Sequence, residues 1–153
     1  MDIVDLPERI TGPSAWYGPD LAASGAWLVT LDSAQSAEVE GQAQAYLAKG
    51  GDIAQMTKAD FALPKSVPLI REAVDECLHR RGFVVLRGLP PHAENIPMAA
   101  AMFYGIGTHM GNARSQNGKG HLLGHVCDLG LSTTDANVRI YQTTERQNYH
   151  TDS

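Results

Sequence analysis

Apolar residues recur at helical spacing most clearly over residues 67–81. One stripe of this segment, at intervals of three and four residues, consists of Ile70, Ala73, Val74, Cys77 and Leu78. Pro68 suits the first turn of a helix, and Gly82 can adopt the left-handed conformation that often ends one. The pattern therefore predicts an amphipathic helix over this segment.

Two further helices are predicted from their capping residues. Asp32 and Ser33 can both cap a helix that continues to about Lys49, and Asn95 can cap another over residues 96–107. Four side chains of the second helix lie at helical spacing and are expected in the core: Met98, Met102, Phe103 and Ile106.

Short apolar runs between glycines, prolines and polar turns predict strands. The better candidates cover residues 26–31, 83–87 and 138–142, the last with alternating polar and apolar positions. Residues 122–127 form a weaker candidate, and a final strand is expected over residues 147–152. Helices thus come early and strands late, as in an α+β fold with a helical layer packed on the beginning of a β-structure.

This order divides the chain into three parts. Residues 1–25 are rich in proline and glycine and are expected to form an irregular arm, anchored by packing of Trp16 and Tyr17. Residues 26–110 are expected to form a mainly helical layer with two strands. Residues 111–153 would hold the later strands.

Composition excludes several classes of protein. The chain has 153 residues, of which 43% are hydrophobic and 19% charged, as in a globular domain. The net charge is −5, and Lys and Arg are scattered along the chain, so the sequence predicts no basic patch for binding nucleic acid. No apolar run is long enough to cross a membrane, and no secretory signal is recognisable at the N-terminus. Cys77 and Cys127 are expected to be buried thiols, and a cytoplasmic location follows from these absences.

Candidate metal chemistry lies in the pair His150 and Asp152. In a strand, residues two apart share a face, so this imidazole and this carboxylate could bind one metal ion while Thr151 points away. Iron(II) oxygenases use two His and one carboxylate on one face of the metal. Arg146 and Asn148 share the predicted strand face and are candidates to line a substrate pocket. The alternative interpretation is that His150 and Asp152 bind no metal and are solvated polar residues of a frayed terminus.

Three separated segments, in their order along the chain, resemble the taurine/2,4-D dioxygenase-like family of iron(II)- and 2-oxoglutarate-dependent oxygenases, also called clavaminate synthase-like. The segments cover residues 81–90, residues 120–126, and residues 138–153 with their aromatic-His-Thr-Asp motif. The resemblance extends over about residues 67–153.

The resemblance implies a double-stranded β-helix, a jelly-roll barrel with helices against one side. It implies Fe(II) as cofactor, held here by His150 and Asp152, with 2-oxoglutarate and O2 as co-substrates. A C–H bond of a small molecule would be oxidised while 2-oxoglutarate becomes succinate and CO2.

The same resemblance implies that part of the site lies beyond these residues. The family's distal His and 2-oxoglutarate-binding Arg follow the His-x-Asp motif at a distance, so the cofactor-binding residues are expected downstream of Ser153. We therefore expect the chain to be the N-terminal part of a longer protein, incomplete as a barrel, inactive when isolated and prone to self-association.

Other functions fit the sequence less well. His121 and His125 could bind zinc if they lay on a helix, but Gly120 and Gly124 disfavour one. On a strand these two residues would lie about 13 Å apart at 3.3 Å per residue, too far to bind one ion. A non-catalytic module or interaction domain with no turnover of its own remains the alternative function. Arg146 could likewise pair with Glu145 or Asp135 outside any pocket.

Overall fold

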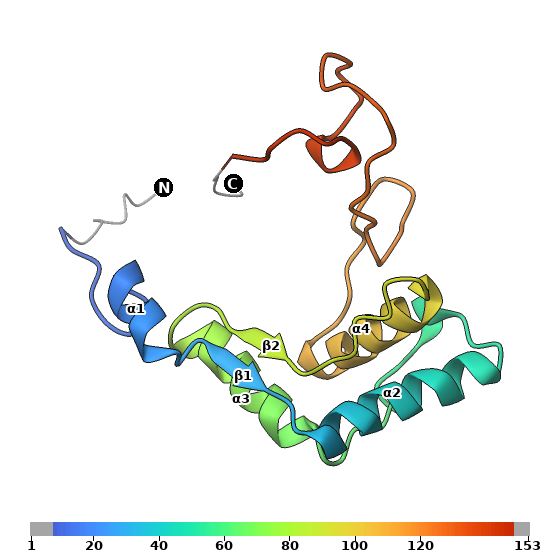
Figure 1. The fold of residues 1–153 in the computed structure, drawn as a ribbon, viewed down its shortest axis with the longest axis horizontal. Helices are drawn as coiled ribbons and strands as arrows, with labels where there is room; N and C mark the ends of the chain where they lie inside the picture. The colour runs from blue at the N-terminus through green and yellow to red at the C-terminus, as the bar shows by residue number, and fades with distance from the viewer. Residues whose placement is uncertain (1–7, 149–153) are drawn as a thin grey trace, which may run out of the picture. The chain divides into compact units, whose positions relative to one another are not determined.

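The computed structural model describes residues 8–148 (Figure 1). The chain divides into two compact units, residues 1–114 and residues 115–153. The elements of the first unit are α1 (Gly18–Ser24), β1 (Leu28–Thr30), α2 (Ser33–Ala48), the 3-10 helix η1 (Ile53–Gln55), α3 (Val67–His79), β2 (Val85–Arg87) and α4 (Ile96–Met110). The second unit contains the 3-10 helix η2 (Ile140–Gln142).

The three predicted helices are confirmed, and local capping explains where two of them begin. At the start of α2, Gln35 N donates to Asp32 Oδ1 at 2.8 Å, and Asp32 N donates to the Gln35 side chain at 2.9 Å. This reciprocal capping box satisfies two backbone donors that the helix leaves free. At the start of α4, Met98 N donates to Asn95 Oδ1 at 3.2 Å, as expected of an Asn cap.

The two early strands are also confirmed, and they pair with each other in parallel. Leu28 lies opposite Val85 and Thr30 opposite Arg87. Parallel neighbours need a long crossover connection, and α2 and α3 lie within it. Gly88 follows β2 at a φ of +104°, and a Cβ there would come within 2.7 Å of the Leu31 carbonyl oxygen. The close approach of the two strand ends therefore requires glycine.

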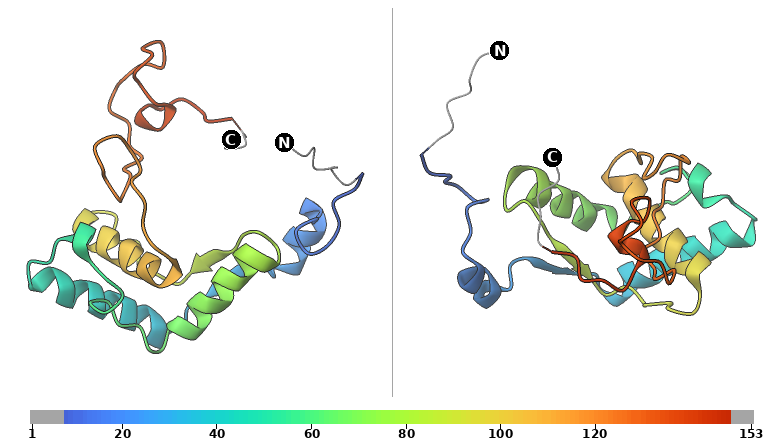
Figure 2. Two further views of the ribbon diagram at one scale, coloured as in Figure 1. Left: turned by 180° about the vertical axis from the view of Figure 1, so that it is seen from behind. Right: turned by 90° about the horizontal axis from the view of Figure 1, so that it is seen from above.

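The core of the first unit forms where α2 and α3 both pack on α4, and α2 and α4 lie side by side in both views of Figure 2. Its buried side chains include Val39, Ala43, Phe61, Leu63, Ile70, Ala73, Met98, Ala101, Met102 and Ile106. Phe103 was expected among them but is 71% exposed. One residue advances an α-helix by about 100°, so Phe103 is turned away from the face that holds Met102.

The predicted apolar stripe of α3 is buried only in its first half. Ile70 and Ala73 are buried, whereas Leu78 is 69% exposed and Cys77 is exposed. Cys127 is exposed as well, and both thiols are free. The expectation of two buried cysteines is therefore wrong. The apolar stripe of α3 is thus longer than the part of the helix that packs into the core.

A polar side chain in α2 holds the start of α3. Ser66 is fully buried, and its Oγ donates to Glu38 Oε2 at 2.7 Å. Ser66 N donates to the same oxygen at 2.9 Å, and Lys65 N donates to Glu38 Oε1 at 2.9 Å. One carboxylate thus satisfies three donors at a helix N-terminus, where negative charge is also favoured by the helix dipole.

The N-terminal arm is more regular than predicted, because α1 occupies residues 18–24 of it. Pro19 lies in the first turn of α1, and Gly25 ends it at a φ of +61°. Trp16 anchors the arm as expected. Its indole N–H donates to the Arg81 carbonyl oxygen at 3.1 Å, and its ring lies edge-on to Phe83 at 5.3 Å between centroids. Tyr17 is 70% exposed and does not share this role.

The second unit lacks the strands predicted for it. Among residues 115–148 no residue is buried and no strand forms, so the described residues do not show a jelly roll. Residues 140–142, expected in a strand, form η2 instead. Gln142 N donates to the Arg139 carbonyl and Thr143 N to the Ile140 carbonyl, so the backbone satisfies itself locally where no neighbouring strand does. The expected strand over residues 147–152 lies partly outside the described residues, and residues 147–148 are not in a strand.

Candidate metal centre

The predicted ligands His150 and Asp152 lie outside the described residues. Their assignment stays a prediction, and it rests on the chemistry of the donor set. A neutral imidazole and a carboxylate two positions apart are the donor types that non-haem iron(II) takes. Among residues 8–148, no three His, Cys, Asp or Glu side chains lie close enough together to hold a metal ion. The described part of the chain therefore offers no rival centre.

The predicted place of the cofactor-binding residues is likewise untested. Ser153, downstream of which the distal His and the 2-oxoglutarate-binding Arg are expected, lies outside the described residues together with both ligands. No described residue was assigned to 2-oxoglutarate from the sequence. The expectation that these residues follow Ser153 therefore stays a prediction.

The two predicted pocket residues lie in the segment that leads to the ligand pair. Arg146 and Asn148 are both exposed, and residues 146–148 belong to no helix or strand. Of the two acids considered as pairing partners for Arg146, Glu145 accepts a hydrogen bond from Thr133 at 2.6 Å. Asp135 accepts one from the backbone of Asn137 at 2.9 Å. A role for Arg146 and Asn148 in binding substrate remains a prediction.

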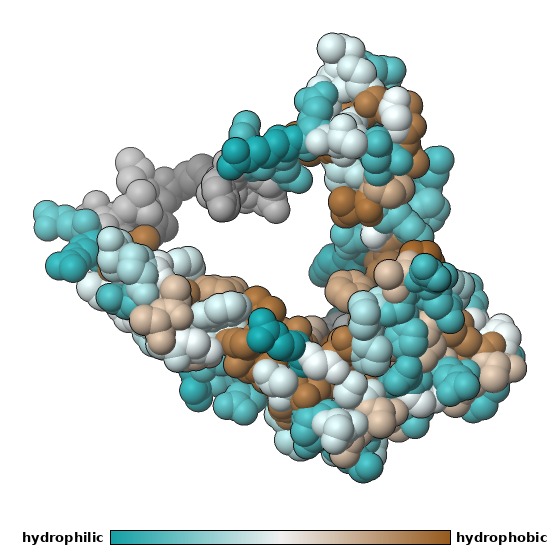
Figure 3. All heavy atoms as spheres, viewed as in Figure 1, coloured by the Kyte–Doolittle hydropathy of each residue, from teal (hydrophilic) through white to brown (hydrophobic). Residues whose placement is uncertain are grey.

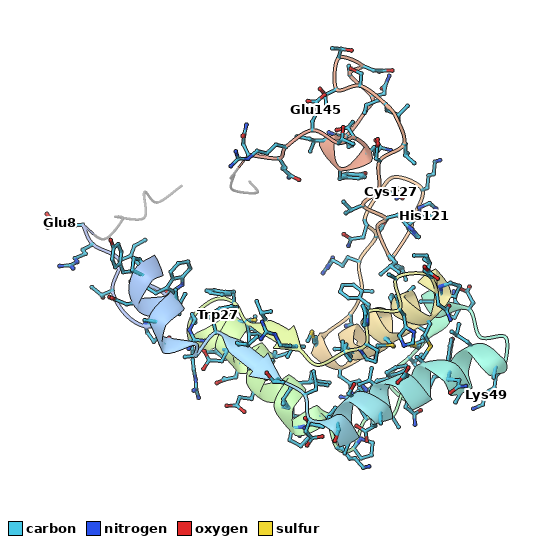
Figure 4. All side chains as sticks on the ribbon, viewed as in Figure 1. Glu8, Trp27, Lys49, His121, Cys127 and Glu145 are labelled. Atoms are coloured by element: carbon cyan, nitrogen blue, oxygen red, sulfur yellow. The ribbon has the colours of Figure 1, made fainter. Side chains whose placement is uncertain are left out.

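Backbone hydrogen bonds join residues 141–142, which precede Arg146 and Asn148, to residues 127–129 of the same unit. Cys127 N donates to the Tyr141 carbonyl at 3.1 Å, and Leu129 N donates to the Gln142 carbonyl at 2.9 Å. Cys127 and Glu145, labelled in Figure 4, come from the two stretches that these bonds bring together. This pairing resembles the start of a ladder, although its spacing is too irregular to make a strand.

Threonine side chains fix the next few residues. Thr143 Oγ1 donates to the Ile140 carbonyl at 2.9 Å and accepts from Glu145 N at 3.1 Å. The Glu145 carboxylate then accepts the hydrogen bond of Thr133, twelve residues earlier. Sequence reasoning did not single out Thr133 or give Glu145 this contact. A hydrogen bond between two exposed polar side chains twelve residues apart produces no periodic pattern in the sequence, so the sequence could not have indicated it.

The two candidate zinc ligands are not arranged as a site. His121 Nδ1 lies 3.0 Å from Asn117 Nδ2, and Asn117 Oδ1 accepts from His121 N at 3.3 Å, within one polar turn. His125 is exposed and belongs to no group of three metal-ligating side chains among the described residues. The fold of this turn accounts for His121 without a metal.

Two histidines of the first unit, His92 and His109, make contacts between segments of that unit. His109, at the end of α4, has Nε2 at 2.6 Å from the Phe61 carbonyl oxygen, so Nε2 carries the proton that is donated. His92 Nε2 lies 2.8 Å from Glu40 Oε1. Each contact joins segments about fifty residues apart in sequence, and both lie in the unit that does not carry the predicted ligands.

Within residues 8–148, two groups have a shifted pKa, and both lie near the loop that follows α2. Hydrogen bonds from the side chain and backbone of Thr57 lower the pKa of Asp60 below 3.8. Desolvation, with the negative charges of Asp60 and Asp52 nearby, raises the pKa of Tyr46 above 10.0. The Tyr46 hydroxyl donates to the Asp52 carbonyl at 2.7 Å.

Comparison with known proteins decides the family. Residues 47–153 match the taurine catabolism dioxygenase TauD, TfdA family. The chain belongs to this family. The match covers the helices α3 and α4, the strand β2 and the segment with His150 and Asp152. The resemblance seen in the sequence is thereby confirmed.

Two curated proteins are similar to this TauD/TfdA-family chain. FR-33289 synthase from Streptomyces rubellomurinus is 26% identical over 149 residues, which are 97% of this chain and 44% of that protein. A taurine hydroxylase-like protein from Stachybotrys chartarum is 29% identical over 133 residues, which are 86% of this chain and 34% of that protein. The chain thus spans less than half the length of these relatives. Within residues 8–148, no helix is both long and apolar enough to cross a membrane.

Proposed function

We propose that this TauD/TfdA-family chain is part of an iron(II)- and 2-oxoglutarate-dependent dioxygenase that oxidises a C–H bond of a small molecule. The observation that carries the proposal is the family match over residues 47–153, which includes the His-x-Asp segment. Members of such a family act on small molecules with 2-oxoglutarate and O2 as co-substrates.

His150, as a neutral imidazole, and Asp152, as a carboxylate, would hold the iron. Bound together with 2-oxoglutarate, iron(II) supplies the activation of dioxygen and the oxidative decarboxylation to succinate and CO2. The protein's own task is to keep the imidazole unprotonated and to bring the substrate's C–H bond to the metal. Thr151, between the ligands, would point to the opposite side of the segment.

Arg146 and Asn148 would line the substrate pocket next to the metal. A guanidinium group favours an anionic substrate, because it offers several donors to a carboxylate, sulfonate or phosphonate group. One relative is named a taurine hydroxylase-like protein, and taurine carries a sulfonate. A panel of small anionic substrates, with taurine among them, is therefore the first choice for assay.

The second unit would supply the first strands of a double-stranded β-helix. Large apolar side chains of this unit are exposed, and hydrophobic residues reach its surface in Figure 3. They are Val126 at 82%, Leu129 at 55%, Leu131 at 45% and Tyr141 at 41% exposure. A jelly roll buries such side chains between two sheets, so these residues would become core when the barrel is assembled.

The proposal is tested by succinate formation from 2-oxoglutarate. The assay uses the polypeptide as its gene encodes it, with iron(II), ascorbate, 2-oxoglutarate and the anionic panel. His150→Ala and Asp152→Ala should each abolish turnover while the circular dichroism stays nearly unchanged. His125→Ala, in an exposed histidine of the same unit, is the matched control and should keep wild-type activity. Wild-type turnover in either ligand variant would remove that residue from the metal site, and absence of turnover and of iron binding in the wild type would favour a non-catalytic module.

A further inference from the structure

A polar turn over residues 115–121 contains the single Asn-Gly pair of the sequence, Asn117 and Gly118. Every residue of this turn is exposed, and none carries an apolar side chain. The turn has nothing to bury, so it is expected at the surface of an assembled barrel as well. Asparagine before glycine is a chemically labile pair, because glycine has no side chain to hinder attack of its backbone nitrogen on the asparagine amide.

Two backbone donors bind the oxygen of the Asn117 side chain. Asn117 Oδ1 accepts from Lys119 N at 3.0 Å and from His121 N at 3.3 Å. When a nucleophile adds to Cγ of this amide, Oδ1 takes the negative charge of the tetrahedral intermediate. Donors that already point at such an oxygen stabilise the intermediate, as in the oxyanion holes of enzymes. The turn therefore favours addition at Asn117 Cγ.

The nitrogen of the same side chain faces a histidine, which is labelled in Figure 4. Asn117 Nδ2 lies 3.0 Å from His121 Nδ1, and an amide nitrogen donates, so Nδ1 accepts and Nε2 carries the ring proton. A nitrogen that leaves as ammonia must first gain a proton. An imidazole takes up and releases protons near neutral pH, so His121 can deliver that proton to the atom that it contacts.

The backbone nitrogen of Gly118 is available as the nucleophile. Among the described residues it donates no hydrogen bond, whereas the nitrogens of residues 119, 120 and 121 each donate one within the turn. The Asn117 carbonyl is held by two of the surrounding groups. It accepts from Gly120 N at 3.0 Å and from Ser115 Oγ at 2.7 Å. The turn thus fixes Asn117 and leaves the attacking nitrogen unengaged.

We infer that Asn117 and Gly118 form a self-modification site, at which His121 is the catalytic residue. Gly118 N loses its proton to solvent and bonds to Asn117 Cγ, and the Cγ–Nδ2 bond breaks. The nitrogen leaves as ammonia with a proton from His121, which regains one from solvent. Water then opens the resulting succinimide at either carbonyl carbon, so that one amide and one water yield an acid and ammonia. The inference does not depend on the proposed function.

The two products change the turn differently. Aspartate adds a negative charge beside His121 and keeps an oxygen that can accept from the Lys119 and His121 nitrogens. Isoaspartate runs the main chain through the former side-chain carbon, which lengthens the backbone between residues 117 and 118. The former Asn117 carbonyl then belongs to a free carboxylate, so isoaspartate should open the turn.

The test measures conversion of residue 117 in the polypeptide as its gene encodes it, at neutral pH. Peptide mapping by mass spectrometry, with chromatography that separates aspartate from isoaspartate, follows both products. The rate in the folded protein is compared with the rate in the same protein unfolded in guanidinium chloride, at matched ionic strength. Folded wild type should convert roughly three- to tenfold faster, the effect of about one hydrogen bond in the transition state.

Three substitutions assign the roles within the site. His121→Gln keeps an acceptor for Asn117 Nδ2 but cannot shuttle a proton, so the folded rate should fall to the unfolded rate. His125→Ala, in an exposed histidine of the same unit, is the matched control and should convert as wild type. A Cβ on Gly118 meets no atom within 4 Å, so Gly118→Ala should keep the turn while its methyl group hinders attack and nearly abolishes conversion.

The outcomes that overturn the inference need no iron and no substrate. A folded rate equal to or below the unfolded rate would show that the turn protects Asn117. A wild-type rate in His121→Gln would remove the histidine from the reaction. Asn112 and Asn137, which precede Ala113 and Val138, are internal references in the same peptide maps and should stay unconverted. Conversion of either reference as fast as Asn117 would also overturn the inference, because the turn would then have no special effect.

Discussion

Gly105 shows how one hydrogen atom in place of a methyl group sets the packing of α4. A Cβ at this position would come within 2.5 Å of the Phe61 ring, and Phe61 is fully buried. The ring can move little, because buried side chains are close-packed. The spacing of apolar residues in α4 predicted the helix but not this contact, since Phe61 lies in an irregular segment whose position no pattern specifies.

Gly105→Ala and Gly107→Ala should therefore have opposite effects on stability. Overpacking against Phe61 should lower the free energy of unfolding by about 1–3 kcal/mol in Gly105→Ala. A Cβ on Gly107 meets no atom within 4 Å, so Gly107→Ala should raise it by about 0.5–1 kcal/mol through helix propensity alone. Urea unfolding followed by circular dichroism measures both. Equal effects of the two substitutions would show that Phe61 does not fill the space beside Gly105.

Asp60 provides a test of local electrostatics. The Thr57 hydroxyl donates to Asp60 Oδ2 at 2.6 Å, and this bond is the largest cause of the lowered pKa. Because the pKa in the folded state lies below 3.8, the contribution of this group to stability is present above that pH and is lost as the pH falls through the folded-state pKa.

Thr57→Val should raise the pKa of Asp60 toward 3.8, since it removes the hydroxyl donor and leaves the backbone donor. The stability of this variant should also fall less steeply with pH below about 4. An NMR titration of the Asp60 carboxyl carbon measures the pKa, with Thr57→Ser as the control that keeps the donor. An unchanged pKa in Thr57→Val would mean that the hydroxyl bond is not what lowers it.

At the scale of elements, the start of α3 depends on a carboxylate from α2. Glu38 accepts from Lys65 N, Ser66 N and Ser66 Oγ, and Ser66 is fully buried. If this acceptor is removed, Ser66 N keeps the Leu63 carbonyl at 3.1 Å and the buried Ser66 hydroxyl keeps only the Gln35 carbonyl at 3.4 Å, while Lys65 N loses the acceptor Glu38 Oε1. A donor that loses its acceptor costs about 1–3 kcal/mol when it cannot reach water.

Glu38→Ala should lower the free energy of unfolding by about 1–2 kcal/mol, because the Ser66 hydroxyl keeps only a weaker acceptor and Lys65 N loses its bond to the carboxylate. Glu38→Gln, which keeps one acceptor oxygen, should lie between it and wild type. Glu72→Ala, at an exposed carboxylate of α3, is the control and should change stability by less than about 0.5 kcal/mol. A loss in Glu38→Ala no larger than in Glu72→Ala would contradict this role of Glu38.

The elements that could be predicted from sequence are those whose signals are local. Asp32 and Asn95 cap their helices as expected, and apolar runs gave the positions of β1 and β2. Strands of the second unit could not be predicted in this way. The alternation over residues 138–142 is present as half-buried Val138 and Ile140, yet η2 forms there. Alternation indicates which side chains face a core, but a strand also needs a neighbour for its backbone groups.

The candidate site was predictable to a similar extent. The His-x-Asp motif and the residues around it indicated the family, and the match over residues 47–153 confirms that family. The contacts that approach this motif were not predictable, because Thr133 and Glu145 are joined across a turn. A motif indicates the residue types that could do chemistry, whereas contacts between residues distant in sequence depend on the fold.

At the scale of the whole molecule, exposed apolar side chains predict association. The second unit exposes Val126, Leu129, Leu131 and Tyr141, and the first exposes Phe103 and Leu78. A polypeptide of residues 1–153 produced alone should therefore form oligomers and bind a hydrophobic dye. Light scattering and dye fluorescence measure this. A compact monomer with a sharp cooperative melt and no dye binding would contradict it and would weaken the proposal of an incomplete barrel.

The central claim is that His150 and Asp152 hold iron(II) for 2-oxoglutarate. The most direct measurement is anaerobic titration of the protein, as its gene encodes it, with iron(II) in the presence of 2-oxoglutarate, followed by the visible charge-transfer absorption of the chelate. Wild type should develop this absorption to a stoichiometric end point, and His150→Ala and Asp152→Ala should not. His125→Ala should titrate as wild type. A wild type that develops no such absorption, or one that His150→Ala and Asp152→Ala leave unchanged, would contradict the account.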